Sequence, residues 1–381
     1  FLMNFVKSAT SEGLADSDGV PHNDYLKLYR QIAQNKELSI IITGHIAVSR
    51  ESRPEPNCIY LTDGEHYPFK LRSRNLARTV QEVKKTNPNV KFLAQLNHGG
   101  RQIPRVQLIK NRTSVVCSTL TGTFKNSMLL FKAPNCHPSN KKYVFDQFLF
   151  GAKQMRNCGF DGVQIHCAHG YLLHDVLVTD YQLVVQLLQN IREEWPTCYL
   201  SVKVNGEERF LKFLEEAVKI ADLVEISAGS YEDPKKMVDN HVQKYSCQFV
   251  RGHQELRQQK AKICITGGFY TKDEAQSVIM QDVTDFVGFG RLYCLAQQTI
   301  VNRLKFPTVV KAIAKLVPLA NAGPATIFYE ETLRRRARGI AFGNEKEEKR
   351  IGVLWWMWTM ILWLLGQQRY CTKRDMLDKK K

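Results

Sequence analysis

Short apolar, β-branched runs alternate with amphipathic segments along most of this 381-residue chain. The eight runs that we expect to be strands are 4–9, 38–43, 90–96, 159–166, 198–204, 221–227, 261–268 and 284–290. Helical periodicity marks the stretches 23–34, 74–85, 145–157, 210–220 and 272–280. Parallel strands need a crossover segment, and an eighth strand can close on the first. The alternation therefore predicts an α/β fold, a parallel TIM (β/α)8 barrel, rather than an open doubly wound sheet.

The barrel is expected to occupy residues 1–340. The stretch 102–140, rich in Thr, Ser, Pro and Asn, is too long for a simple loop and is expected to form a lid or insert over the barrel top. Residues 341–381 form a basic and apolar tail, in which the uncharged run 351–366 carries four tryptophans between basic flanks. That run suits a candidate membrane helix, spanning or interfacial, or alternatively a helix docked on a protein surface.

The net charge of +17 is unevenly spread. Residues 334–381 carry 13 Lys and Arg against 5 Asp and Glu, and no basic and aromatic interleaving accompanies them, so no nucleic-acid partner is expected. Ten cysteines are spread from Cys58 to Cys371 without a CxxC pair, which is typical of reduced thiols. No secretory signal is visible either. We expect a cytoplasmic protein, with membrane association through the tail as an open alternative.

Polar and glycine residues gather where the expected strands end. These ends read SATSE, ITGH, QLNHGGR, IHCAHGY, VKVN, ISAG, TGGF and GFGR. In a TIM barrel the functional face is formed by the carboxyl ends of the strands. The fourth end is the densest, because it presents His166, His169 and Tyr171 within six positions. These rings could be structural, or with His98 half of a zinc site, but no carboxylate or thiolate stands at a ligand-like interval, so no metal is expected.

Several segments together resemble a known family. GFDGVQIHCAHGYLLHDVL, FLAQLNHGGRQ, DLVEISAGSYE and ITGGFYTKDEA followed by DFVGFGR are similar, in the same order, to the old yellow enzyme family of FMN-dependent ene-reductases, in its NADH:flavin oxidoreductase branch. The resemblance runs from about Asn4 to Gly339. It implies an FMN-binding TIM barrel that transfers hydride from NADH or NADPH, through the flavin, to an activated alkene such as an α,β-unsaturated carbonyl compound. It leaves a homo-oligomer open.

The resemblance also assigns the flavin contacts. The residues concerned are Ala9, Thr10, Ser11, Gly44, Gln95, Lys203, Gly267, Gly268, Gly290 and Arg291. By analogy, the segment 9–11 lies along the ring, with Ser11 donating to a flavin carbonyl, and Gly44 leaves room beneath it. Gln95 would pair with the pyrimidine edge and Lys203 would favour the anionic reduced flavin. The three later glycines and Arg291 would hold the phosphate.

The resemblance further implies the catalytic set. His166 and His169 would donate hydrogen bonds to the carbonyl or nitro oxygen of a substrate stacked over the flavin, while Tyr171 would protonate the α-carbon. A neutral histidine can donate such a bond, so no pKa near neutrality is required.

The chain departs from the family's pattern after the fourth strand. The family has a longer loop there, whereas residues 174–181 here lead almost directly into LVVQLLQNI. One alternative is therefore a catalytically impaired, flavin-poor barrel that acts as a membrane-associated scaffold. A second alternative is an enzyme like the tRNA dihydrouridine synthases, although the region QLNHGGRQIP lacks the cysteine expected of them.

Overall fold

The computed structural model describes residues 4–55, 57–61, 67–103, 141–228, 242–269, 271–290, 293 and 332–338. The predicted lid at 102–140 is described only at its first two residues, and the predicted tail at 341–381, with its apolar run 351–366, lies outside the described residues. Within the described ranges, no helix is long and apolar enough to cross a membrane.

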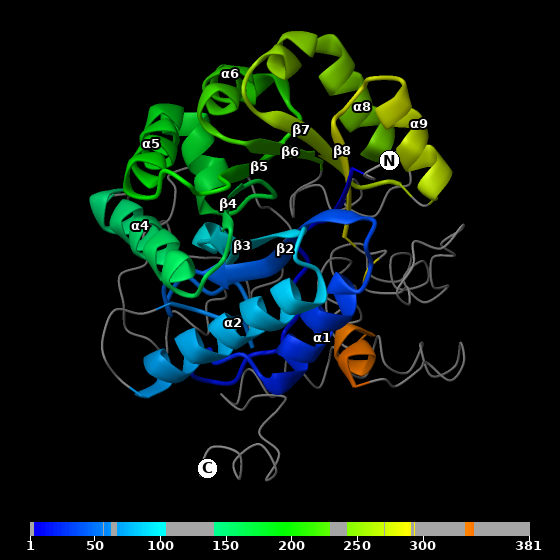
Figure 1. Cartoon of the computed structure of the whole chain (residues 1–381). Helices are drawn as coiled ribbons and strands as arrows, with labels where there is room; N and C mark the ends of the chain where they lie inside the picture. Colours follow the sequence, from blue (N-terminus) through cyan, green and yellow to red (C-terminus); the bar gives the residue numbers. More distant parts are fainter. Residues whose placement is uncertain are drawn as a thin grey trace, which may run out of the picture.

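Eight parallel strands form a closed barrel in sequence order, with the first strand paired to the last (Figure 1). The strands are β1 (Phe5–Lys7), β2 (Leu38–Ala47), β3 (Lys91–Asn97), β4 (Gly162–Cys167), β5 (Ser201–Asn205), β6 (Leu223–Ser227), β7 (Lys262–Thr266) and β8 (Phe286–Phe289). The predicted TIM barrel is thus confirmed, and each strand overlaps the run that predicted it.

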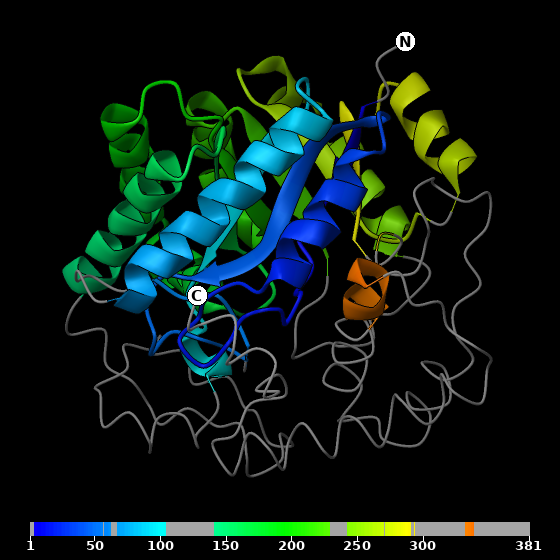
Figure 2. The ribbon, with the colours of Figure 1, turned by 60° about the horizontal axis from the view of Figure 1, so that its bottom comes forward.

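Helices surround the strands on the outside of the barrel (Figures 1 and 2). They are α1 (Asn23–Ala33), α2 (Tyr67–Thr86), α4 (Lys141–Asn157), α5 (Leu172–Glu194), α6 (Leu211–Ile220), α8 (Val242–Gly252) and α9 (Lys272–Met280), with the short 3-10 turns η1 (Gly100–Gln102), η2 (Glu208–Phe210) and η3 (Gln254–Gln258). A short helix at 332–337 lies beside α1, where Arg338 Nε contacts Asp24 Oδ2 at 2.5 Å.

Helix α5 occupies the segment after β4, where the family's pattern has a longer loop. It runs for 23 residues and has one non-helical residue, Asp180, with φ −159° and ψ 70°. The Asp180 carboxylate accepts a hydrogen bond from Lys141 Nζ of α4 at 2.7 Å. The chain therefore passes from β4 toward β5 through one kinked helix, which packs its apolar face against the barrel.

Strand alternation divides the apolar residues into two cores. The larger core fills the layer between strands and helices and includes Phe92, Ala94 and Leu96 of β3. A smaller core inside the barrel holds Val6, Ile40, Ile42, Leu93, Leu223 and Cys264. Nearer the carboxyl ends of the strands, the inward positions become polar, and Ser8, Gln95, Gln164, Lys203, Glu225 and Thr266 are each at most 7% exposed. The barrel interior thus changes from apolar to polar toward the end where the site is expected.

Three aspartates are arranged alike at the opposite, amino-terminal face. Asp161, Asp222 and Asp285 each precede a strand, and each accepts a hydrogen bond from a backbone N–H at the start of the neighbouring strand, with distances of 2.7, 2.8 and 2.8 Å. A basic side chain pairs with each carboxylate: Lys84 with Asp161, Arg192 with Asp222 and Arg257 with Asp285. This face is therefore built from repeated structural contacts.

Candidate active site

The end of β4 brings together the three aromatic side chains that the sequence singled out. The ring centroids of His166 and His169 are 5.2 Å apart, and those of His166 and Tyr171 are 4.9 Å apart. The chain reverses at once after the strand, because His169 and Gly170 both adopt left-handed backbone angles, with φ of 62° and 79°. Such a conformation is unfavourable for histidine and is found where the surrounding structure enforces it. His174, one turn into α5, packs its ring against Phe210.

Burial keeps both site histidines neutral. It lowers the pKa of His166 well below the ordinary value, and the nearby His169 and Lys203 lower it further. Burial also lowers the pKa of His169, with Lys203 acting in the same direction. His166 Nδ1 accepts the backbone N–H of Ala168 at 3.3 Å, which assigns the single ring proton to Nε2. His166 is thereby prepared as a neutral hydrogen-bond donor, and His169 Nε2 lies 3.0 Å from the Ser227 hydroxyl.

A buried histidine of β2, which sequence reasoning did not select, forms an ion pair beside Tyr171. His45 Nε2 lies 3.1 Å from a carboxylate oxygen of Glu55, and its ring is 5.9 Å from that of Tyr171. Burial alone would lower the pKa of His45, but Glu55 raises it well above the ordinary value. The Ser11 hydroxyl donates to Glu55. It was predicted to donate to a flavin carbonyl, which would therefore compete with the Glu55 carboxylate for this hydrogen bond.

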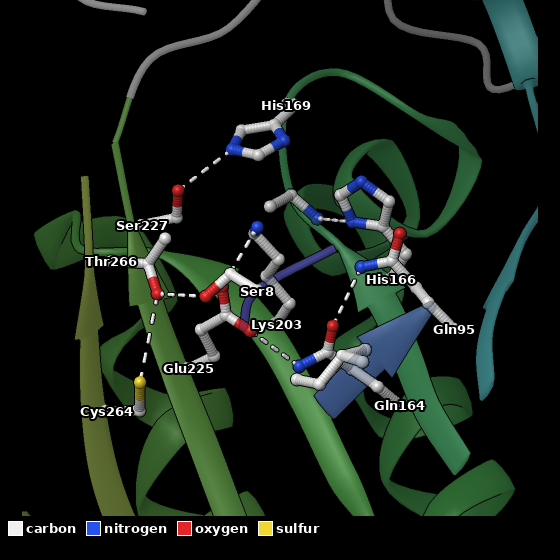
Figure 3. Close-up of polar contacts among 12 residues, drawn as sticks. Ser8, Gln95, Gln164, His166, His169, Lys203, Glu225, Ser227, Cys264 and Thr266 are labelled. Carbon is white, nitrogen blue, oxygen red and sulfur yellow. Dashed lines mark hydrogen bonds and ion pairs between the residues drawn. The ribbon is translucent and has the colours of Figure 1, made fainter. Parts of the chain in front are cut away.

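Gln95 and Lys203 point into the barrel and are linked by other buried side chains (Figure 3). Gln95 Nε2 donates to Gln164 Oε1 at 2.7 Å, and Gln164 Nε2 donates to Glu225 Oε2 at 2.7 Å. The Lys203 ammonium lies 3.0 Å from the other oxygen of Glu225. In register, Lys203 stands level with His166 on one side and with Glu225 on the other. The two predicted contacts of the flavin pyrimidine edge are therefore members of one connected group.

Unpaired polar atoms at the strand ends leave capacity for a polar ligand. Thr10 Oγ1 is buried and has no hydrogen-bond partner among the described residues, and both amide atoms of Asn97 share this state. Asn97 is fully buried and has the inward parity of Leu93 and Gln95 on β3. Buried polar groups are rarely left unpaired. The donor and acceptor set at this face therefore fits a flavin, whose ring presents both acceptors and a donor along its edge.

The glycines predicted to surround the cofactor occupy close or left-handed positions. A Cβ on Gly44 would overlap the Glu12 carboxylate and the Thr10 carbonyl oxygen, so the close neighbours in this structure are protein atoms. Gly267 and Gly268, at the end of β7, have φ of 103° and 78°, which leaves a turn without side chains. Gly290 lies beside Thr10, Ala9 packs against the interior core, and Arg291 lies outside the described residues.

His98, the residue weighed as a further zinc ligand, is engaged by its own loop. Its Nδ1 accepts the backbone N–H of Gly100 at 3.0 Å, and burial lowers the pKa of its ring to about 3. In the part of the chain that the structure describes, no group of three or more His, Cys, Asp or Glu side chains is arranged to hold a metal ion.

Comparison with known proteins gives consistent matches. The sequence profile of the NADH:flavin oxidoreductase / NADH oxidase family matches residues 4–182. The NADH-dependent flavin oxidoreductase nadA of Aspergillus parasiticus is 24% identical over 337 residues, covering 76% of this chain and 72% of that protein. A putative 12-oxophytodienoate reductase 3 of Oryza sativa subsp. japonica is 23% identical over 321 residues, covering 76% of this chain and 78% of the relative.

The fold is also found among solved structures. The old yellow enzyme homologue from Zymomonas mobilis superposes with a TM-score of 0.59 at 18% identity, covering 77% of this chain and 86% of that one. At this level of identity the likeness establishes the shared barrel, while the similarity to the family rests on the sequence matches.

Proposed function

Because this chain belongs to the old yellow enzyme family of FMN-dependent NADH:flavin oxidoreductases, we propose that it is an ene-reductase acting on α,β-unsaturated carbonyl compounds. It is an oxidoreductase that uses FMN, with NADH or NADPH as reductant. The observation that carries the finer proposal is the cluster of His166, His169 and Tyr171 at the end of β4. Two neutral imidazoles and a phenol suit a neutral substrate that develops negative charge on one oxygen.

The residues proposed to hold FMN lie around the same barrel mouth. Gln95 and Lys203 would meet the pyrimidine edge (Figure 3). Thr10 offers a buried hydroxyl that has no hydrogen-bond partner among the described residues. The bare backbone at Gly267 and Gly268, with Gly290 on the next strand, would receive the phosphate. When bound, FMN supplies the hydride that reaches the β-carbon of the substrate, after receiving it from the nicotinamide.

His166 would bind and polarise the substrate. Its Nε2–H would donate to the carbonyl oxygen, while Nδ1 stays fixed by the Ala168 N–H. Since electron density moves to that oxygen as hydride adds to the β-carbon, the hydrogen bond strengthens in the transition state.

Tyr171 would complete the reduction by giving its phenolic proton to the α-carbon. The alkene then gains one hydride and one proton, and the Tyr171 oxygen recovers its proton from water. The Tyr171 ring is 4% exposed and lies against His166, so the substrate would be enclosed between these rings and the cofactor.

The test is anaerobic reduction of the FMN-loaded protein by NADH or NADPH, followed by reoxidation with cyclohex-2-enone and detection of cyclohexanone. We expect the exchange His166→Ala with His169→Ala to slow enone reoxidation by at least tenfold while FMN stays bound. Unchanged reoxidation would remove both histidines from the mechanism. A wild-type protein that carries no bound flavin, even after incubation with FMN and removal of the unbound cofactor, would favour the scaffold alternative instead.

A further inference from the structure

Lys203 and Glu225 form an ion pair inside the barrel, away from water. Their side chains are 5% and 0% exposed, and Nζ lies 3.0 Å from Oε1. Burial alone would raise the pKa of Glu225, but Lys203 and the hydrogen bond from Gln164 lower it below the ordinary value. A buried carboxylate in this position is expensive unless its partner is always present, so the two charges depend on each other.

The charge of Glu225 also determines how the neighbouring amides are turned. A carboxylate can only accept, so Gln164 must direct its NH2 group to Glu225, and a second bond from that group to Ser201 Oγ at 3.0 Å agrees. The Gln164 carbonyl is then left to face Gln95, which must offer its own NH2 group. The Gln95 carbonyl is thereby the end left for a ligand.

We propose that Glu225 is a positioning residue of the flavin site: its carboxylate holds the Lys203 ammonium and, through Gln164, fixes the orientation of the Gln95 amide. The proposal rests on the proposed FMN site, and it assigns to one buried carboxylate the placement of both pyrimidine-edge contacts (Figure 3). Glu225 itself would not contact the flavin, because its two oxygens are engaged by Lys203 and Gln164.

Removing this charge has a defined electrostatic effect. In Glu225→Gln, the Lys203 ammonium loses its counter-ion while the flavin is oxidised and regains one when the flavin is reduced to an anion. Reduction therefore becomes easier, because the negative charge that Glu225 places near the flavin has been removed. In addition, a glutamine has one acceptor oxygen and one NH2 group where Glu225 has two acceptor oxygens, and Lys203 and Gln164 each meet a different one of these. The Gln95 orientation is therefore no longer enforced.

The first experiment is a double-mutant cycle on the protein without FMN, using thermal unfolding of Glu225→Gln, Lys203→Met and the combined variant. Each single exchange leaves one buried charge unpaired, so both are expected to lower the unfolding midpoint, and the second exchange should restore much of the loss. Additive losses in the double variant would overturn the coupling between the two residues. Because FMN is absent, this result does not depend on the proposed function.

The second experiment measures FMN affinity and the midpoint potential of the bound flavin. For Glu225→Gln we expect at least a tenfold rise in the Kd of FMN and a higher midpoint potential. Glu225→Asp keeps the charge and should retain a midpoint potential close to that of the wild type. Wild-type affinity and potential in Glu225→Gln would overturn the proposal. A wild-type chain that binds no FMN would instead remove the proposed function and this role with it.

Discussion

His45 and His166 are buried in one site, yet their surroundings move their pKa values in opposite directions. Glu55 raises the pKa of His45, whereas burial and the nearby cations lower that of His166. The result is a His45–Glu55 ion pair beside a neutral hydrogen-bond donor, His166. His166 can donate to a substrate oxygen without exchanging a proton during the reaction.

His98 gives a prediction for stability in acid. Its pKa is lowered to about 3 by burial, whereas in the unfolded chain it is about 6.5. Below pH 6.5 the unfolded state therefore binds more protons, and the free energy of unfolding falls as pH falls, by up to about 1.4 kcal/mol per pH unit for this residue. His98→Asn keeps an acceptor for the Gly100 N–H but cannot titrate, so its stability should fall less between pH 6.5 and 5.

Urea unfolding at pH 7, 6 and 5 measures this difference. The wild-type and His98→Asn curves should converge, or cross, as the pH is lowered. Parallel losses in the two proteins would show that the buried ring does not carry the linkage. The other site histidines are unchanged in this comparison and contribute equally to both proteins.

Gly44 gives a second prediction. It tests whether a glycine is required at this position by neighbouring protein atoms or by the flavin ring. The resemblance places Gly44 beneath the flavin ring, while in the structure a Cβ would overlap Glu12 and Thr10. Gly44→Ala should therefore destabilise the protein even without FMN, by about 1–3 kcal/mol. Denaturant unfolding of the FMN-free protein checks this. If stability is unchanged and only FMN affinity falls, the ring and not the protein sets the requirement.

Which residues could be found from sequence depended on what their strands showed. His166, His169 and Tyr171 stood out because they end an apolar run, and the structure brings them together. Glu225 had a comparable signal, a charge in the middle of the apolar run DLVEIS. Its partner Lys203, on the neighbouring strand β5, could not be identified without the strand register. His45 escaped notice because its charge depends on Glu55, which follows in a separate loop.

At the scale of elements, the aspartates before β4, β6 and β8 make the same kind of contact between neighbouring strands. Each carboxylate ties the start of one strand to the start of its neighbour and also receives a basic side chain. In every case the neighbour is the preceding strand in sequence. These contacts stabilise the face of the barrel opposite the site, so sequence changes there should affect folding and leave the chemistry unchanged.

Asp222→Ala tests this separation. Asp222 accepts from the Leu200 N–H at 2.8 Å and pairs with Arg192 at 2.6 Å, and its loss leaves a backbone donor unsatisfied. We expect the free energy of unfolding to fall by about 1–3 kcal/mol, with the Kd of FMN unchanged. Asp146→Ala, an exposed position on α4, is the matched control and should change neither quantity. A weaker FMN affinity in Asp222→Ala alone would contradict the separation of the two faces.

The strands were predictable from sequence and the helices only partly. All eight strands follow β-branched runs, because parallel barrel strands are buried on both faces and leave an unbroken apolar signature. Helix α5 was not among the predicted helices, since its first turn carries the site motif and its later part reads as an apolar run. Helix α8 was also not among the predicted helices, and it follows residues outside the described part.

For the whole molecule, FMN should act as a stabilising ligand. Its proposed contacts come from β1, β3, β5, β7 and β8, so bound cofactor would link strands around most of the barrel. At a free concentration one hundred times the Kd, FMN should add about 2.7 kcal/mol to the free energy of unfolding. Riboflavin, which lacks the phosphate, should bind more weakly by about 1.5–3 kcal/mol if the glycine-rich end receives that group. Equal thermal shifts for the two ligands would place the phosphate elsewhere.

The pairing of β1 with β8 has a consequence for folding during synthesis on the ribosome. Phe5 of the first strand must find Val287 of the last, so the barrel cannot close until nearly the whole of it has left the ribosome. At a synthesis rate of roughly 5–20 residues per second, the first strand waits roughly 15–60 s for its partner. Meanwhile its open edge is available to wrong partners, which makes the nascent chain a natural client for chaperones. Because the proposed cofactor contacts come from several strands, FMN is expected to bind only after the barrel has closed.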